Sequence, residues 1–221
     1  MYTVKEIFST LQGEGAQAGR AAVFCRFTGC NLWSGREEDR AQAICQFCDT
    51  DFVGINGVGG GKFPDANSLA NAIDSEWLQM NRSQTNKYLV FTGGEPLLQL
   101  DEVLIKALHE RYFQIAIETN GTIKPPAHID WICVSPKNGS RLVCLQGDEI
   151  KYVIPQNHQI PHLNEIELSL KRFEKMNFQH FFLQAMDGPR QAENINLAIE
   201  LCKKRPLWRL SLQQHKLIHL P

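Results

Sequence analysis

The stretch YLVFTGGEP, residues 88–96, decides the fold class, because it joins an apolar run of strand length to a glycine turn. The run Tyr88–Phe91 reads as a buried strand, and Thr92–Pro96 brings polar groups directly after it. Paired glycines at such a place allow a ligand to approach the backbone closely. A plain Gly-Gly turn followed by a Glu-Pro that starts a helix explains the same residues, so this stretch alone leaves both interpretations open.

Strand-length apolar runs alternate with helical patterns along the rest of the chain. The runs are Ala21–Phe27, Ile115–Ile117, Trp131–Val134, Glu149–Ile154, His180–Leu183 and Trp208–Leu212. Helical spacing of apolar residues is present within 69–77, 103–108, 166–173 and 195–202. This alternation predicts right-handed βαβ units and a mostly parallel sheet.

The connections 122–129 and 135–145 contain prolines and are too short or irregular for a crossover helix. A complete eight-unit barrel needs about 250 residues, whereas this chain has 221. We therefore expect an α/β fold, a truncated, open partial (β/α) barrel, as one domain spanning residues 1–221.

Composition excludes several classes of function. The 23 Lys and Arg against 24 Asp and Glu give a net charge of −1, which does not suit a nucleic-acid binder. The first residues, MYTVKEIF, lack the features of a secretory signal, and no apolar run approaches the roughly 18 residues of a membrane span. Seven cysteines, an odd number, favour reduced thiols and metal ligation over disulfides. We expect a cytoplasmic protein that binds no membrane.

Three cysteines, Cys30, Cys45 and Cys48, have the spacing C-x14-C-x2-C. Iron–sulfur clusters and structural zinc sites are normally closed by four ligands. A set of three therefore suggests a four-iron cluster with one iron open to a small molecule. Cys25 lies nearby and would complete a four-thiolate zinc site, so the spacing alone leaves both possibilities open.

Polar groups follow four of the predicted strands where they end. They are the cysteine loop after Phe27, Thr92–Pro96, Glu118–Gly121 and Ser135–Lys137. Ligands of open α/β sheets and barrels bind at the carboxyl ends of strands. Four such groups on successive strands predict one shared site.

A three-cysteine loop after one strand and Gly-Gly-Glu-Pro after the next resemble the radical S-adenosylmethionine (SAM) superfamily. The chain departs from the common C-x3-C-x2-C spacing by a long insertion, residues 31–44. That insertion, LQGEG at 11–15, SPK at 135–137, LQAMDGP at 183–189 and HKLIHLP at 215–221 resemble the 7-carboxy-7-deazaguanine synthase family. The resemblance covers nearly the whole chain.

The resemblance implies a set of cofactors and the residues that bind them. Cys30, Cys45 and Cys48 would hold a 4Fe–4S cluster whose open iron chelates SAM. The SAM-binding residues would be Gly93, Gly94 and Glu95 at the methionyl amine, and Glu118, Asn120, Ser135, Lys137 and Gln184 around the ribose and carboxylate. Thr50 would bind Mg²⁺, with Asp49 as a rival ligand.

The resemblance also implies a lyase that converts 6-carboxy-5,6,7,8-tetrahydropterin to 7-carboxy-7-deazaguanine and ammonia, in queuosine precursor biosynthesis. Its substrate-binding residues would be Gln12, Gly13, Glu14, Arg26, Thr92, His215 and Pro221. An inter-strand salt bridge is the alternative role for Arg26. The implied partners are a flavodoxin or ferredoxin as electron donor and a second copy of the chain.

Two other functions remain open at this stage. A radical SAM activase acting on a partner protein fits the small size but not the cysteine spacing. A zinc-stabilised binding module would use Cys25 as fourth ligand and would leave the polar strand ends unexplained.

Overall fold

A computed structural model describes residues 1–156 and 162–220. These residues form one nine-stranded sheet with the order β3-β1-β2-β4-β5-β6-β7-β8-β9. Pairing is parallel from β2 through β9, whereas β1 is antiparallel to both β2 and β3. The strands are β1 (Tyr2–Leu11), β2 (Ala21–Phe27), β3 (Gly61–Phe63), β4 (Lys87–Gly93), β5 (Phe113–Thr119), β6 (Trp131–Val134), β7 (Gln146–Ile154), β8 (Asn177–Ala185) and β9 (Trp208–Ser211).

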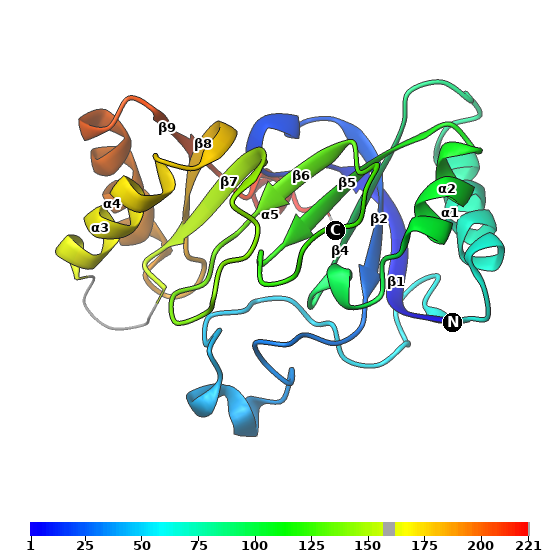
Figure 1. The fold of residues 1–221 in the computed structure, drawn as a ribbon, viewed down its shortest axis with the longest axis horizontal. Helices are drawn as coiled ribbons and strands as arrows, with labels where there is room; N and C mark the ends of the chain where they lie inside the picture. Colours follow the sequence, from blue (N-terminus) through cyan, green and yellow to red (C-terminus); the bar gives the residue numbers. More distant parts are fainter. Residues whose placement is uncertain (157–161, 221) are drawn as a thin grey trace.

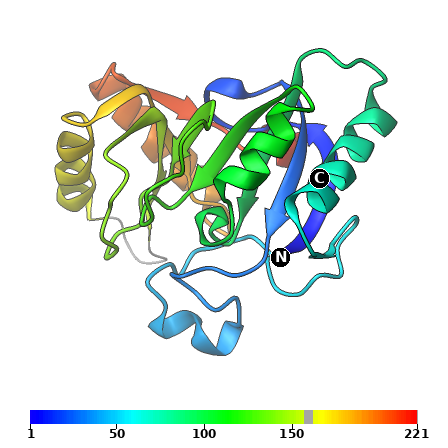
Figure 2. The same cartoon turned by 45° about the vertical axis from the view of Figure 1, so that its right-hand side comes forward.

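The α-helices cover one face of this sheet in two pairs (Figures 1 and 2). They are α1 (Ala66–Met80) with α2 (Glu102–His109), and α3 (Leu163–Phe173) with α4 (Gln191–Lys204). The short α5 (Gln214–Leu217) lies apart from these pairs and contributes His215 and Lys216 to a cavity at the ends of the strands. Asp65 and Asp101 cap α1 and α2 by accepting hydrogen bonds from the N–H groups of Ser68 and Leu104. Within the described residues no helix has the length and apolar character needed to cross a membrane.

The sheet confirms the sequence predictions of a mostly parallel α/β fold that is not closed. Strands β3 and β9 are its two edges. All seven predicted strands and all four predicted helices are present, and β5–β6 and β6–β7 are joined without an α-helix, as expected. The antiparallel strand β1 was not predicted, because the register shifts between Val4 and Glu6 and breaks its alternation.

Two hydrophobic cores hold the helices against the sheet. The first packs α1 and α2 on β1, β2, β4 and β5, and includes Cys25, Leu89 and Phe91. The second packs α3 and α4 on β7, β8 and β9, and includes Tyr152. Ile132 on β6 packs against both cores. Because side chains alternate along a strand, the opposite face of the sheet carries the residues in between, and these form the site.

The loop between β2 and β3 contains the three cysteines and the 31–44 insertion. A 3-10 helix, η2 (Glu37–Gln42), forms within the insertion. This segment projects beyond the ends of the strands (Figures 1 and 2).

Candidate active site

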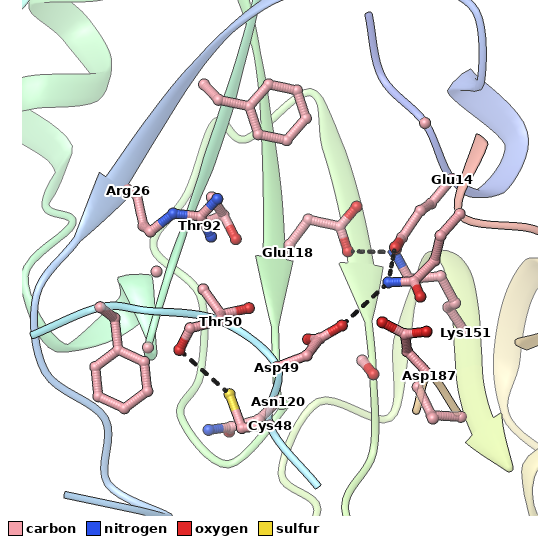
Figure 3. A pocket seen from close by; sticks show the side chains of 18 of the residues that line it. Glu14, Arg26, Cys48, Asp49, Thr50, Thr92, Glu118, Asn120, Lys151 and Asp187 are labelled. Atoms are coloured by element: carbon pink, nitrogen blue, oxygen red, sulfur yellow. Dashed lines mark hydrogen bonds and ion pairs between the residues drawn. The ribbon is translucent and has the colours of Figure 1, made fainter. Parts of the chain in front are cut away.

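A cavity of about 440 Å³ opens at the carboxyl ends of the parallel strands. All four polar groups that were predicted to share a site contribute to its lining, through Cys30, Cys45, Cys48, Thr92, Gly93, Gly94, Glu118, Asn120, Ser135 and Lys137. Arg26 and Thr92 lie at one side of the cavity, and Glu14 and Lys151 lie at the opposite side (Figure 3). The cavity therefore offers chemically different groups at its two sides.

The three cysteines of the spacing motif all border the cavity as free thiols. Burial raises the pKa of Cys30 and of Cys45, and for Cys45 the positive charge of Lys137 acts in the opposite direction. The N–H of Leu32 donates a hydrogen bond of 3.4 Å to the Cys30 sulfur. These thiols are placed to become ligands once a positively charged metal group offsets their burial.

The cysteine geometry does not suit a zinc ion with Cys25 as fourth ligand. Cys25 is fully buried in the first hydrophobic core, on the face of β2 opposite Arg26. A tetrahedral zinc with Zn–S distances of about 2.3 Å brings its sulfurs within about 4 Å of one another. In the described part of the chain, the three cysteines are not among the groups whose ligand atoms lie within 4.8 Å. Their wider spread fits a larger metal group.

The paired glycines bring the end of β4 into contact with the cysteine loop. Gly93 has a φ of 154°, and a Cβ there would lie 2.4 Å from the Phe27 oxygen. A Cβ on Gly94 would lie 2.1 Å from the Gly29 oxygen and 2.8 Å from Cys30 Cβ. Only glycine allows this approach, so the backbone of Gly93 and Gly94 borders the cavity next to the cysteines.

Glu95 is not among the residues that line this cavity. Its side chain is fully buried and accepts hydrogen bonds from Leu97 N–H, Thr119 Oγ1–H and Asn120 N–H, at 2.7–3.0 Å. Its carboxylate therefore ties the end of β4 to the end of β5. The residue thus positions the glycines and Asn120, and its contact with a ligand stays a prediction.

Lys137 and Asn120 lie on the cysteine side of the cavity. Lys137 Nζ donates to both Ser135 O and Ser135 Oγ at 2.7 Å, which places its charge at the end of β6. Asn120 Nδ2 donates to Asn31 Oδ1 at 2.9 Å and so links β5 to the cysteine loop. A cation and an amide thus border the space beside the cysteines.

Arg26 forms the inter-strand salt bridge and also lines the cavity, the two possibilities that the sequence left open. Its Nε donates to Glu6 Oε1 across β1 and β2 at 2.7 Å, and its side chain also lines the cavity together with Thr92. The guanidinium has further N–H groups beyond the one that pairs with Glu6. The inter-strand salt bridge therefore holds Arg26 in place without using its whole binding capacity.

Lys151, on β7, is the site residue that the sequence analysis missed. Its side chain is 4% exposed, and its Nζ donates to Glu14 Oε2 at 2.5 Å and to Glu118 Oε2 at 2.8 Å (Figure 3). Burial opposes ionisation of Glu14, but Lys151, together with Gln213 and His215, outweighs it and lowers the pKa of Glu14. Glu14 is therefore held as a carboxylate inside the cavity.

Three glutamines complete this charged group, and one of them, Gln213, donates from Nε2 to Glu14 Oε1 at 3.0 Å. Gln12 Nε2 donates to Glu118 Oε1 at 3.3 Å, and Gln184 Nε2 donates to Glu14 Oε1 at 3.1 Å. Glu149 lies behind them, buried, and burial raises its pKa. This wall of the cavity therefore presents acceptors to any ligand rich in N–H donors.

The remaining predicted residues lie around the mouth of the cavity. Thr50 and His215 line it, and His215 packs so closely on Gly13 that a Cβ there would lie 2.2 Å from His215 Nδ1. Asp49 accepts a hydrogen bond of 2.6 Å from Lys216 Nζ, so its carboxylate is already paired. Pro221 lies outside the described residues.

Known proteins resemble this chain over its whole length. A 7-carboxy-7-deazaguanine synthase of Bordetella pertussis is 57% identical, covering 100% of this chain and 99% of that protein. The synthase of Caulobacter vibrioides is 55% identical with the same coverage, and that of Bacteroides thetaiotaomicron is 37% identical. The chain belongs to the 7-carboxy-7-deazaguanine synthase family.

The fold agrees with this membership. The crystal structure of QueE from Escherichia coli matches with a TM-score of 0.67 and 27% identity, covering 97% of this chain and 94% of that one. No protein-family model matches the chain. As a member of the 7-carboxy-7-deazaguanine synthases, the chain is a radical SAM lyase with a 4Fe–4S cluster and SAM as cofactors.

Proposed function

We propose that this chain converts 6-carboxy-5,6,7,8-tetrahydropterin to 7-carboxy-7-deazaguanine and ammonia in the cavity at the strand ends. The single observation that carries this proposal is the content of that cavity. It is lined by the three cysteines, the paired glycines, Lys137, and the oppositely charged Arg26 and Glu14. When bound, the cluster and SAM supply a 5′-deoxyadenosyl radical that removes a hydrogen atom from the substrate.

Cys30, Cys45 and Cys48 would hold the cluster. Each lines the cavity, and their separation suits a metal group larger than one ion. Arg26 and Lys151 face the same cavity from other strands. The 31–44 insertion would then be part of the cluster-binding loop.

The SAM would lie beside the cysteines, along the ends of β4, β5 and β6. The backbone carbonyls of Gly93 and Gly94 would accept hydrogen bonds from its ammonium group. Lys137 would pair with its carboxylate, and Ser135 would hold the lysine in place. Asn120, Glu118 and Gln184 would orient the ribose. Glu95 would act at least through Asn120 and the glycines, because its carboxylate bonds to Leu97, Thr119 and Asn120.

The pterin would lie between the two charged sides of the cavity. Its carboxylate would accept paired N–H groups of Arg26, with Thr92 adjacent. Its N–H-rich edge would donate to Glu14 and to the loop at Gln12 and Gly13. Lys151 favours this arrangement, because it keeps Glu14 ionised and therefore able only to accept hydrogen bonds.

Mg²⁺ would bind at Thr50 and at the substrate carboxylate. One hydroxyl is few ligands, but Mg²⁺ keeps several waters and takes oxygen atoms from substrates. Thr50 follows the cysteines directly and lines the cavity, whereas the Asp49 carboxylate is paired with Lys216. This pairing favours Thr50 over Asp49 as the protein ligand.

Two features of the proposal involve other proteins. A low-potential donor such as a flavodoxin or ferredoxin would reduce the cluster. The chain would act as a homodimer, for which an open sheet with two free edges leaves room.

The test is turnover with defined substrate under anaerobic conditions. The reconstituted chain with SAM, Mg²⁺ and reductant should release 7-carboxy-7-deazaguanine and equal ammonia, and omission of Mg²⁺ should slow it. Arg26→Ala should raise the substrate KM by at least tenfold while SAM affinity changes less than twofold. SAM cleavage without product, or equal losses of both affinities in the variant, would contradict the proposal.

A further inference from the structure

Arg40 lies in the insertion but reaches back to the cysteine turn. It belongs to η2, and its Nη1 donates to Gln46 O at 2.9 Å and to Cys48 O at 3.0 Å. These two carbonyls belong to the short turn that begins at Cys45. A side chain from the insertion therefore closes the C-x2-C turn from outside.

The guanidinium of Arg40 is fixed from two further directions. Its Nε and Nη2 donate to the two carboxylate oxygens of Glu37 at 2.7 and 2.6 Å, a bidentate pair. Its plane lies over Trp33, 4.0 Å from the ring centroid. Trp33 is itself buried against Phe52, and its indole N–H donates to Arg36 O at 3.1 Å. The position of the Arg40 side chain is thus fixed by Glu37 and Trp33 before any cluster binds.

The guanidinium of Arg40 joins an exposed carboxylate to the backbone of the cysteine turn. The Arg40 side chain is 25% exposed, whereas that of Glu37 is 76% exposed, so water screens the Glu37 charge more strongly. An arginine stays protonated in proteins, so its guanidinium keeps a positive charge where it bonds to the Gln46 and Cys48 carbonyls. The site therefore has a permanent cation beside two of its three cysteines.

We propose that Arg40 is a positioning residue for the iron–sulfur cluster, which fixes the Cys45–Cys48 turn and favours the reduced cluster by its charge. The proposal rests on the proposed function, because it needs the cluster that the three cysteines would bind. Reduction adds one negative charge, which a neighbouring cation stabilises, and net charge and hydrogen bonding near the sulfurs set cluster potentials. The role of the 31–44 insertion would then be to supply Arg40 to the Cys45–Cys48 turn.

The chain offers a matched control in the same helix region. Arg36 also belongs to the insertion, but its side chain is 71% exposed and its ion pair with Glu38 spans 3.7 Å. Its replacement removes the same charge from the same segment without touching the cysteine turn.

The test compares anaerobically reconstituted wild type with R40Q, R36Q and E37Q. EPR-monitored redox titration gives the cluster potential, and a chelator assay gives the rate of iron loss. In R40Q the ratio of reduced to oxidised cluster at a fixed potential should be about tenfold lower, which corresponds to a potential lower by about 59 mV for one electron. R40Q should also lose iron several-fold faster than the wild type. R36Q should match the wild type in both. E37Q, which keeps the Arg40 charge but frees its guanidinium, should lose iron faster with little change in potential.

The outcomes separate this proposal from the proposed function. A wild type that binds no cluster would refute the proposed function before Arg40 is tested. A wild type with four irons, and R40Q equal to R36Q in potential and in iron loss, would overturn the proposal for Arg40. Faster iron loss with an unchanged potential in R40Q would overturn its electrostatic part.

Discussion

Replacing Lys151 with methionine removes the cation from a buried group of carboxylates. Lys151 is 3% exposed and donates to Glu14 at 2.5 Å and to Glu118 at 2.8 Å, with Glu149 buried nearby. Removing one partner of a buried ion pair costs about 3–5 kcal/mol, because the other partner stays buried and uncompensated. For a domain of this size, 1 kcal/mol shifts the Tm by about 2–4 °C. K151M should therefore unfold about 6–20 °C below the wild type.

Between pH 5 and 8 the stability of the variant should depend on pH through Glu14, whereas Glu14 gives the wild type no pH dependence in this range. Burial opposes ionisation of Glu14, but Lys151 lowers its pKa below the usual value of 4.5. Such a group stabilises the folded state above its unfolded pKa and loses this contribution as the pH falls through the folded pKa. In K151M burial is opposed only by weaker groups such as Gln213 and His215, so the folded pKa of Glu14 rises and stability should increase as the pH falls from about 8 to 5.

Thermal unfolding followed by circular dichroism, at several pH values between 5 and 8, measures both effects. Lys203→Met is the matched control, because Lys203 is 67% exposed and pairs with Glu200 at the surface. That control should change stability by no more than about 0.5 kcal/mol. The reasoning about Lys151 is refuted if K151M is as stable as K203M. It is equally refuted if acid lowers the Tm of K151M and wild type in parallel.

Two further variants test the cysteine loop. Cys25→Ala should keep the full iron content and lose about 1 kcal/mol of stability, since Cys25 packs in the first hydrophobic core; loss of iron in this variant would revive the four-cysteine site. Gly94→Ala should bind little iron and little SAM, because a Cβ there would lie 2.1 Å from the Gly29 oxygen and neither backbone can yield cheaply. Gly61→Ala is its control, with 3.9 Å to the nearest atom, and equal iron binding by the two variants would disprove the close-contact argument.

The apolar strands and helices could be predicted because their residues face a core. Tyr88–Phe91 and Trp131–Val134 are short and apolar, and both are strands. The site residues at the strand ends followed from the same reasoning, because parallel strands bring their carboxyl ends to one edge. Strand β1 escaped prediction because its cavity-facing residues, such as Glu6, are polar and a register shift interrupts their spacing.

Side-chain roles were harder to predict than positions. Ile150, Tyr152 and Ile154 alternate along β7 and face the second core, so Glu149 and Lys151 between them face the other side of the sheet. This alternation is visible in the sequence and could have predicted Lys151 as a site residue. The hydrogen bonds of Glu95 to Thr119 and Asn120 were not predicted, because these partners are distant along the chain, and its contact with a ligand stays a prediction. The contact of Arg40 with the cysteine turn depends on how the insertion folds back, which no spacing reveals.

The division of the interior into two cores has a mechanical consequence. The groups proposed to grip the pterin carboxylate stand on the half packed with α1 and α2, whereas Lys151 and Gln184 stand on the half packed with α3 and α4. Between the halves lies β6, a strand of four residues without a helix of its own, where Ile132 bridges the two interiors. A molecule held at both ends of the cavity would therefore connect the two halves across this short strand, and we expect filling the site to stiffen the sheet there.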